Sequence, residues 1–468
     1  MAKTFKHLFY WNFVLLALVV AFNATLTERA EASPKIDPKL RPLLGSSASN
    51  EKSIPVILVF KDKKPLPGGF YTQFQRESVE NMLRENALES QAATVSQLTK
   101  MQTQNVHIQM LRFWLNNSIA LYAPASVIRN LAQDEDLAAI YSNRHFKIFA
   151  TNPVSVPTTQ QPFTYGLEKM QIPQLRQSRA DVDGRGVRVG ILDTGIDGSH
   201  PDLRDRVLLF RDFIGKKTTP YDDYGHGTHV AGTISGGNAS GTAIGVAPGV
   251  KLIVGKIFDG SGNSTDAEIL QAMQWIADPD GNPRTNDGPM LVSNSWGGDS
   301  PTSSMDPADD PQCRALSGWM KLGILPVFAA GNTGPSPGSV GLPGACPEAL
   351  AVGATDSSDH IAFFSSRGPA HWKTGDILKP LVSAPGVHVV SSVPGGKYEA
   401  EDGTSMATPH VAGLAALAYQ VKPGATVAEV VKAIESGADN VSGEQPPDDV
   451  YGWGRVNAIG TLKKMGLR

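Results

Sequence analysis

Cysteine and charge are both scarce in this sequence. Its 468 residues include two cysteines, Cys313 and Cys346, too few for a disulfide scaffold or a four-cysteine zinc site. Charged residues make up 19% of the chain, below the usual ~25%, and the formal net charge is −3. Because there is no basic excess, neither nucleic acid nor an anionic membrane is indicated as a partner.

Long apolar runs are scarce as well. Near the N-terminus an apolar run of ten residues, 13–22, follows the basic residue Lys3, whereas a helix that crosses a membrane needs about 20 residues. Ala30 and Ala32 place small side chains where a signal peptidase cleaves. The pattern predicts a secretory signal peptide over residues 1–32, with an uncleaved anchor as the alternative.

What the chain does contain is typical of a large globular protein. Hydrophobic residues make up 41%, enough for a large core. The 47 glycines and 33 prolines are about 17% of the chain, short of the ~25–30% that marks low-complexity disorder. Export would place Cys313 and Cys346 where a disulfide persists; two unpaired buried thiols are the alternative.

Residues 33–150 are predicted to form a small α+β unit. Its expected elements are an apolar strand, one or two amphipathic helices, a hairpin turn and a short helix, in the order 54–60, 71–104, Asn116-Asn117 and 125–131. Residues 149–163, rich in Pro, Thr and Gln, are expected to be a linker.

Residues 151–468 are predicted to form an α/β domain with a largely parallel sheet flanked by helices. Strand-like and helix-like segments alternate through this part of the chain, as expected for such a sheet. The expected strands are 187–192, 250–258, 290–295, 324–330 and 349–355. The expected helices are 228–235, 265–277, 311–322, 404–420 and 426–436. Thr265 and Glu268 form a capping-box pattern.

An acid and a histidine occupy positions suited to catalysis. Asp193 ends the strand 187–192 and is followed by Thr-Gly; it is placed either for chemistry at the carboxyl edge of the sheet or for an ordinary turn. His226 lies between two glycines at a helix start, and His229 lies one turn further in, where packing is expected. Zinc is disfavoured because the HExxH pattern is absent.

A serine and an asparagine follow later in the chain. Ser405 comes after a glycine turn and before an apolar helix, so backbone N–H groups and the helix dipole surround its hydroxyl. With a base, such a serine becomes a nucleophile. His410 lies in the helix body and is expected to pack there. Asn332 follows the strand 324–330, either as a turn residue or as a donor to a developing oxyanion.

Together these segments resemble the subtilisin (subtilase) family of serine peptidases. The resemblance covers residues of about 165–468 and rests on DTGID, HGTHVAGT, AAGN and GTSMATPHVAG, in the family order Asp, His, Asn, Ser. It implies Ser405 as nucleophile, His226 as general base, Asp193 as the orienting carboxylate and Asn332 as oxyanion donor. The insert 278–289 and FSSRGP resemble the bacillopeptidase F branch.

By the same resemblance, two runs would line the substrate cleft; sheet interior is the other interpretation of both. They are Ser295, Trp296, Gly297 and Ala329, Ala330, Gly331. The resemblance implies an endopeptidase acting on proteins or peptides. The signal peptide predicts secretion, to a periplasm or out of the cell, with no membrane association after signal removal, and nothing in the sequence indicates more than a monomer. Residues 33–150 resemble the inhibitory propeptides of the family. Self-cleavage is expected within 147–163; the bond and the preferred side chain stay open.

No catalytic cofactor is expected, and a structural calcium ion is suggested at two places. Asp202 matches a calcium ligand of the family, but its partner loop has Ala239 where the family commonly has Asn. Asp278, Asp280 and Asn282 have the spacing that begins a calcium loop. A solvated turn explains these three residues equally well.

Two other functions compete with the peptidase. Ser336 lies in GPSPG, which satisfies the GxSxG pattern of an α/β-hydrolase esterase, but a nucleophile elbow runs directly into a helix and Ser336 is flanked by prolines. A catalytically silent binding module would require a broken set of catalytic residues. All four chemical positions are intact here, so the peptidase is favoured.

Overall fold

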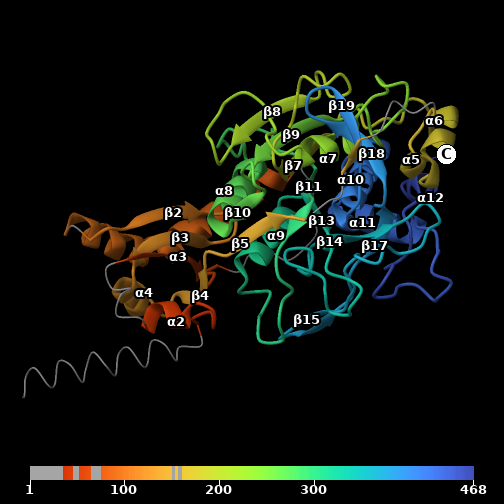
Figure 1. The fold of residues 1–468 in the computed structure, drawn as a ribbon. Helices are drawn as coiled ribbons and strands as arrows, with labels where there is room; N and C mark the ends of the chain where they lie inside the picture. Colours follow the sequence, from red (N-terminus) through yellow and green to blue (C-terminus); the bar gives the residue numbers. More distant parts are fainter. Residues whose placement is uncertain are drawn as a thin grey trace, which may run out of the picture. The chain divides into compact units, whose positions relative to one another are not determined.

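The computed structural model describes residues 35–45, 52–64, 75–104, 106–149, 153–155 and 161–467 (Figure 1). The expected signal peptide, residues 1–32, lies outside them. The chain divides into two compact units, one of residues 1–65 and 86–144 and the other of residues 66–85 and 145–468. Among the described residues, no helix has both the length and the apolar character needed to cross a membrane.

The smaller unit is an antiparallel sheet with helices. Its strands run in the order β2-β3-β1-β4, and every pairing is antiparallel. The expected strand, hairpin and short helix are all present, and a single long helix covers most of 71–104. The elements are α2 (Arg41–Gly45), β1 (Ser53–Phe60), α3 (Arg76–Thr103), β2 (Gln109–Phe113), β3 (Ser118–Pro124), α4 (Ala125–Leu131) and β4 (Leu137–Ser142). Residues 76–85 of α3 belong to the larger unit.

The conformation of the turn between β2 and β3 accounts for the asparagine in it. Asn117 has φ 50°, a left-handed conformation that asparagine tolerates better than most residues. Its side-chain amide donates to the carboxylate of Asp62 at 3.1 Å. The hairpin brings apolar residues of β3 against β1, and Leu58, Ile119 and Leu121 are fully buried in the core of this unit.

The larger unit is built on a seven-stranded sheet in the order β17-β14-β13-β11-β7-β9-β8. All six pairings are parallel, which confirms the predicted α/β class. The strands are β7 (Arg188–Asp193), β8 (Val207–Asp212), β9 (Lys251–Lys256), β11 (Leu291–Asn294), β13 (Leu325–Ala329), β14 (Leu350–Thr355) and β17 (Val382–Pro385).

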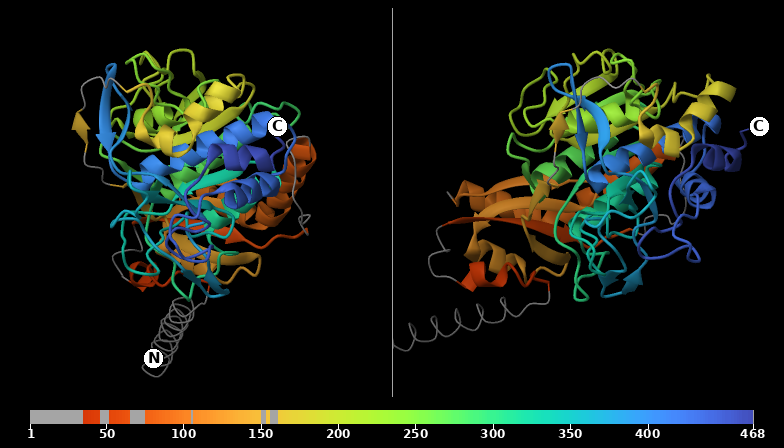
Figure 2. Two further views of the ribbon diagram at one scale, coloured as in Figure 1. Left: turned by 90° about the vertical axis from the view of Figure 1, so that its right-hand side faces the viewer. Right: turned by 45° about the vertical axis from the view of Figure 1, so that its right-hand side comes forward.

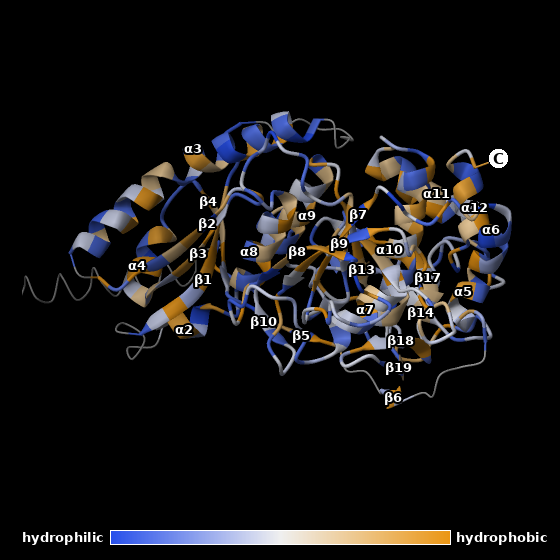
Figure 3. Cartoon of the chain, turned by 90° about the horizontal axis from the view of Figure 1, so that it is seen from above, coloured by the Kyte–Doolittle hydropathy of each residue, from blue (hydrophilic) through white to orange (hydrophobic). Residues whose placement is uncertain are grey.

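Helices cover both faces of this sheet, so its central strands are apolar throughout. Helices α7 and α10 pack on each other, as do α8 and α9, and the two pairs lie on opposite faces (Figure 3). Helices α11 and α12 lie side by side and both pack on α10 (Figure 2), and α6 packs on α5 and α12. The bounds are α5 (Tyr165–Lys169), α6 (Ile172–Ser178), α7 (His226–Ser235), α8 (Asp266–Ala277), α9 (Pro311–Lys321), α10 (Thr404–Val421), α11 (Val427–Gly437) and α12 (Ala458–Lys464).

The start of α8 follows its predicted capping box. The carboxylate of Glu268 accepts the backbone N–H and the hydroxyl of Thr265, both at 2.9 Å. This satisfies donors that a helix N-terminus otherwise leaves free. Trp275 near the end of α8 packs against Phe213.

Three small sheets complete the larger unit. One has the order β10-β5-β12, another β18-β19-β6, and the third pairs β15 with β16. β6 falls inside the expected linker 149–163. It pairs antiparallel with β19. The bounds are β5 (His145–Ile148), β6 (Val154–Ser155), β10 (Asn263–Thr265), β12 (Trp296–Gly297), β15 (Ala370–Trp372), β16 (Gly375–Ile377), β18 (Val389–Val393) and β19 (Lys397–Glu401).

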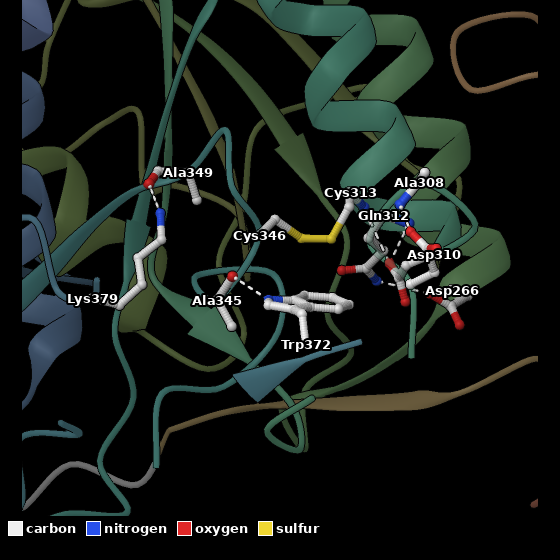
Figure 4. The surroundings of a disulfide bond; sticks show 11 residues. Asp266, Ala308, Asp310, Gln312, Cys313, Ala345, Cys346, Ala349, Trp372 and Lys379 are labelled. Atoms are coloured by element: carbon white, nitrogen blue, oxygen red, sulfur yellow. Dashed lines mark hydrogen bonds between the residues drawn. A yellow bond between two sulfur atoms is a disulfide. The ribbon is translucent and has the colours of Figure 1, made fainter. Parts of the chain in front are cut away.

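The two cysteines form a disulfide (Figure 4). Cys313 is in the first turn of α9, and Cys346 precedes β14; their Cα atoms are 5.3 Å apart. Asp310 caps the helix beside the bridge, accepting the N–H of Cys313 at 3.1 Å. The indole of Trp372 donates to the carbonyl of Ala345 at 3.0 Å. The bridge therefore ties α9 to the segment that follows the β13 carboxyl end.

Candidate active site

Three of the expected site residues follow neighbouring strands of the central sheet. Asp193 ends β7, Ser295 directly follows β11, and Asn332 lies shortly after β13. These strands are adjacent and parallel, so their carboxyl ends share one edge. His226 and Ser405 lie in the first turns of α7 and α10, which pack on each other.

The carboxylate of Asp193 holds the imidazole of His226. Oδ1 of Asp193 lies 2.8 Å from Nδ1 of His226, and both side chains are buried. The same oxygen accepts the backbone N–H of Thr194 at 2.7 Å. Nε2 of His226 has no hydrogen-bond partner among the described residues. With Nδ1 engaged by the carboxylate, Nε2 is the nitrogen left to accept a proton.

Asp222 shapes the turn that presents His226, and the sequence analysis missed it. Its carboxylate accepts the N–H of Gly225 at 2.8 Å and the N–H and hydroxyl of Thr228 at 2.9 and 2.7 Å. It also accepts the hydroxyl of Thr194 at 2.9 Å. An acid shortly before a helix start is the available signal for such a capping role.

The pKa of His226 is raised above its ordinary value. Burial alone lowers the pKa, but the charge and hydrogen bond of Asp193 outweigh burial, and the charges of Glu401 and Asp222 add to the increase. Glu401 and Asp222 line, with His226, a hollow of about 470 Å³. Oε2 of Glu401 has no hydrogen-bond partner within the described part of the chain.

Ser405 makes a hydrogen bond with a different group. Its hydroxyl donates to the carbonyl oxygen of Ser295 at 2.9 Å, and the hydroxyl of Ser295 donates to the carbonyl oxygen of Ser405, also at 2.9 Å. The serine is therefore fixed at the end of β11 rather than bonded to His226. Nucleophile–base bonds are often loose before a substrate binds, and rotation about one side-chain bond redirects this hydroxyl.

Asn332 is oriented by the helix that carries Ser405. Its Oδ1 accepts the N–H of Thr404 at 3.0 Å and the hydroxyl of Thr404 at 2.8 Å. That hydroxyl also accepts the N–H of Gly331 at 3.2 Å. Because the amide oxygen is held by Thr404, the NH₂ group is turned the other way, as an oxyanion donor requires. Thr404 is a positioning residue that the sequence analysis missed.

The two expected cleft runs are part of strands or directly follow one. Trp296 and Gly297 form β12, and the indole of Trp296 donates to the carbonyl of Leu192 at 2.9 Å. Ala329 ends β13, and Ala330 donates its N–H to Val352 and accepts the N–H of Gly341. Gly331, with φ 114°, makes the turn toward Asn332. These residues are buried, and β12 also pairs with β5.

Asp202 is held entirely by protein donors. Its Oδ1 accepts the N–H of Ala239 at 2.7 Å, and its Oδ2 accepts the hydroxyl of Tyr398 at 2.6 Å. The ring of Tyr398 packs edge-on against His200. Each oxygen of this carboxylate therefore has one protein donor.

A second acidic group lies after α8. Carboxylate oxygens of Asp278, Asp280 and Asp287 lie within 4.8 Å of one another, whereas Asn282 uses its side chain to accept the N–H of Arg284. Oδ2 of Asp278 pairs with Arg84 at 2.5 Å. Of the three residues with calcium-loop spacing, Asp278 and Asp280 belong to this acidic group, and its third member is Asp287 rather than Asn282.

The residues around Ser336, in the GPSPG motif, do not form a nucleophile elbow. Ser336 lies in the loop that follows β13, and the next regular element is the strand β14 rather than a helix. The esterase arrangement is therefore absent at this serine. His229 and His410 are buried, as expected, and burial lowers the pKa of both, for His410 to about 4. Each ring also donates to a backbone carbonyl, His229 through Nε2 to Val389 at 3.0 Å and His410 through Nδ1 to Met406 at 2.8 Å.

Comparison with known proteins adds independent findings. Residues 184–454 match the model described as the subtilase family. The chain is 35% identical to Bacillopeptidase F of Bacillus subtilis (strain 168) over 421 residues, covering 83% of this chain and 29% of that protein. It is 34% identical to serine protease AprX of the same organism over 369 residues, covering 74% of this chain and 78% of AprX.

A third relative is alkaline elastase YaB of Bacillus sp. (strain YaB). It is 38% identical over 301 residues, which cover 64% of this chain and 70% of the elastase. The chain thus spans less than a third of Bacillopeptidase F but most of the length of the other two relatives.

Proposed function

The chain belongs to the subtilase family of serine-type endopeptidases, and on that premise we propose that it hydrolyses peptide bonds with Ser405, His226 and Asp193. The buried hydrogen bond between Asp193 and His226 carries the proposal. It fixes the orientation of the imidazole and stabilises the cation that forms when Nε2 takes a proton. Ser405 begins the helix packed against the one that presents His226.

Acylation begins when Oγ of Ser405 turns from the carbonyl of Ser295 toward Nε2 of His226. Oγ attacks the substrate carbonyl carbon as Nε2 takes its proton. The imidazolium then gives this proton to the leaving amine as the peptide C–N bond breaks. A water molecule, deprotonated by Nε2, then attacks the acyl-enzyme. The ester bond to Oγ breaks as the imidazolium returns the proton to Oγ, which releases the acid and free Ser405.

Charge on the substrate oxygen is stabilised from two sides. The NH₂ group of Asn332 and the backbone N–H of Ser405 are the proposed donors. Thr404 keeps the Asn332 oxygen engaged, so the amide needs no reorientation during the reaction. The family uses no catalytic cofactor, and the acid–base chemistry here rests on side chains alone.

The proposed substrates are extended or unfolded segments of proteins and peptides, bound by a monomer. Backbone groups of Ser295, Trp296 and Gly297 would pair with the substrate chain on one side. Ala329, Ala330 and Gly331 would wall the pocket for the side chain before the scissile bond. The small side chains of this second run and the parallel edge that carries them support this assignment.

The enzyme is proposed to be secreted and made as a zymogen. Residues 1–32 would direct export, and residues 33–150 would act as an intramolecular inhibitor until cut away. A propeptide also suits the fold, because a parallel sheet of seven strands forms from distant segments and folds slowly. The antiparallel unit built by residues within 35–144 supports the assignment of an independent propeptide.

A structural calcium ion is proposed at one of two places, Asp202 or the group of Asp278, Asp280 and Asp287. Their carboxylates offer the hard oxygen ligands that calcium prefers, and Oδ1 of Asp278 is buried without a partner among the described residues. Thermal unfolding of the purified protein in calcium and in a chelator tests this. A Tm that does not differ between the two removes calcium from the account.

The function is tested by incubating the purified protein with casein, with and without a serine-directed covalent inhibitor, and mapping the cut bonds by mass spectrometry. Ser405→Ala should abolish cleavage and accumulate as precursor, because no acyl-enzyme forms. Ser336→Ala is the matched control and should mature and cleave casein normally. Cleavage of small esters only, or loss of activity in Ser336→Ala instead, contradicts the proposal.

A further inference from the structure

Arg76, the first residue of α3, is buried in the larger unit. Its side chain belongs to the segment proposed as propeptide, yet the residue is only 4% exposed. Its Nε donates to the carbonyl oxygen of Leu322 at 3.2 Å, and its Nη2 donates to the carbonyl oxygen of Pro289 at 2.8 Å. Two backbone carbonyls therefore receive one planar guanidinium, whose donors form a fixed fork that no other side chain presents.

Gly288 leaves the room that this guanidinium fills. A Cβ atom at residue 288 would stand 2.6 Å from Nη1 of Arg76, closer than two such atoms approach in proteins. Burial, followed by the charge of Arg188, lowers the pKa of Arg76 to about 10, so the group still carries its charge at neutral pH. The backbone of Gly288, Pro289 and Leu322 thus forms a slot that holds a buried cation.

The slot lies at the amino edge of the central sheet. Pro289 precedes β11, and Leu322 ends α9 shortly before β13. Ser295 and Asn332 follow the carboxyl ends of the same two strands. Six residues of extended chain, from Pro289 to Ser295, span about 20 Å. The slot is therefore separate from the residues proposed for catalysis.

Two further charged residues of α3 lie on the same face of the helix as Arg76. Glu80 and Arg84 follow at intervals of four residues, the spacing that aligns side chains along a helix. The carboxylate of Glu80 accepts Nε of Arg84 at 2.7 Å, and Nη2 of Arg84 lies 2.5 Å from Oδ2 of Asp278. The side chain of Arg84 is 33% exposed, so the deeper contact of this face is the one at Arg76.

These contacts become the only hold on this part of α3 once the chain is cut. Residues 76–85 group with residues 145–468, but a cut within 147–163 separates the two segments covalently. Releasing residues 76–85 withdraws a charged guanidinium from two carbonyl acceptors. Hydrogen bonds of this charge-assisted kind are stronger than those between neutral groups, so the release is expected to be slow.

We propose that Gly288, Pro289 and Leu322 form a guanidinium-binding site of the enzyme, separate from the substrate cleft, and that Arg76 bound there keeps the propeptide on the enzyme after the cut. The inference rests on the proposed function, because it requires a zymogen that cuts itself. Cutting the chain and losing the propeptide are then two separate steps, and the second is governed by Arg76. Arg84 contributes less, because its ion pair is more exposed.

Time courses of the full-length chain test the role of Arg76. Mass spectrometry follows the cut and the loss of the N-terminal piece, and casein hydrolysis follows the appearance of activity. In the unchanged chain, activity should lag behind the cut. Arg76→Ala should shorten the lifetime of the cut complex by about 30-fold or more, because a buried group loses two charge-assisted bonds. Arg76→Lys should recover little, because an ammonium is a point charge without the planar fork.

Variants elsewhere on α3 provide the scale. Arg84→Ala should shorten the lifetime of the cut complex by about two- to fivefold. Lys100→Ala is the matched control, at an exposed cation of the same helix, and should change the lifetime by less than about twofold. Equal lifetimes for the unchanged chain and Arg76→Ala, or equal losses in Arg76→Ala and Lys100→Ala, overturn the inference.

A measurement on the unchanged protein covers the case in which Arg76→Ala fails to fold. Phenylglyoxal, which modifies accessible guanidinium groups, is added to the cut complex, and the modified residues are mapped by mass spectrometry. Arg76 should react far more slowly than the exposed Arg204 while the N-terminal piece stays bound, and as fast as Arg204 after its release. Equal reaction of the two residues in the cut complex would show that the slot is not occupied.

Failure of the inference differs from failure of the proposed function. A chain that neither cuts itself nor cleaves casein overturns the proposed function. A chain that does both, but loses its N-terminal piece at the cut without a lag, overturns the guanidinium site and leaves the peptidase in place. A lag that Arg76→Ala abolishes and Lys100→Ala preserves supports both.

Discussion

The strands of the central seven-stranded sheet and those of the three-stranded sheet β10-β5-β12 are stabilised in different ways. In the first, helices cover both faces, and strands from Val189 to Val382 belong to one continuous core. In the second, the middle strand β5 is bound by backbone pairing and by a few aromatic contacts. Asp193 and the segments bearing Asn332 and Ser295 belong to the first sheet, whereas the segment bound beside the nucleophile belongs to the second.

The difference assigns chemistry and recognition to different kinds of structure. Groups that must keep their geometry through many turnovers are anchored in a close-packed core, where small displacements are costly. A substrate must come and go, so it is bound by main-chain groups that any extended peptide offers. Changes in the first sheet should therefore affect the reaction rate, and changes in the second should affect the choice of substrate.

The largest effect is expected from Asp193→Asn. The amide is nearly the size of the carboxylate, but it neither stabilises the imidazolium nor selects the required tautomer, so kcat should fall by about 10⁴-fold. Casein hydrolysis measures this, and an unchanged Tm would show that the sheet is intact. Asp181→Asn, at an exposed acid paired with Arg179, should have normal activity. Comparable losses in both variants would contradict the assignment.

Asn332→Ala comes next. Removing one donor from the oxyanion site should lower kcat by about 10²–10³-fold, a magnitude established for subtilisin itself, with little change in KM. Thr404→Val, which removes the hydroxyl that holds the amide oxygen, should lower kcat by a smaller factor, and Thr404→Ser should recover most of it. A change confined to KM in these variants would place Asn332 in substrate binding instead.

Removing the disulfide tests the core around the first sheet. Cys313→Ser with Cys346→Ser opens a loop of 33 residues in sequence separation and should cost about 2–4 kcal/mol of unfolding free energy. Chemical denaturation measures this value. Peptide preference should not change, since the bridge joins α9 to the segment before β14 and β5 belongs to another sheet. A changed peptide preference at unchanged stability would show that the bridge affects the β10-β5-β12 sheet. It would contradict the separate roles given to the two sheets.

Gly298→Ala probes the second sheet alone. The three heavy atoms nearest the added Cβ would all be ring atoms of Phe146, at 2.9, 3.1 and 3.7 Å. For the peptide HFKIFAT, which copies residues 145–151, kcat/KM should fall by about tenfold, the scale of one methyl group in a pocket. For the peptide with Ala in place of that first Phe, kcat/KM should stay the same. An equal loss on both peptides would mean that the substitution disturbs the catalytic residues.

The smallest effect concerns pH. His226 acts as base only when neutral, and Asp193, with Glu401 and Asp222, raises its pKa, so the acid limb of kcat/KM should lie above the ordinary value of about 6.5. Glu401→Gln removes one of the charges that raise the pKa, so the limb should move to lower pH. A limb that moves to higher pH, or does not move, would show that Glu401 exerts no field on the base.

The sequence predicted the parallel sheet because its strands are buried on both faces and read as apolar runs. Strands such as 187–192 and 324–330 and their helices appear within a few residues of the expected bounds. β8 and β17 were not anticipated: Leu208 and Leu209 on β8 are exposed, and β17 is a short strand containing Pro385. Edge and short strands give weak periodicity, and their pairing is fixed by tertiary contacts.

Of the site, the sequence identified the residues with motif context but not those that hold them. Asp193, His226, Asn332 and Ser405 follow recognisable strand ends or helix starts. Thr404 and Asp222 act through hydrogen bonds across the fold, 72 and 28 residues away from partners such as Asn332 and Thr194, which local spacing does not encode. The pairing of β5 with β10 and β12 joins three segments that are far apart in the sequence, so it has no local signal.

The contact between Phe146 and Gly298 has a consequence for how this gene changes over time. If every molecule must cut its own chain once before it cleaves other proteins, the sequence at its own cleavage site must fit its own substrate-binding residues. A larger residue at 298 obstructs the ring at 146, so a substitution at either position survives only with an accommodating change at the other. Positions 146 and 298 should therefore vary together among relatives. The size of the side chain at 146 would then follow the space that residue 298 leaves for it.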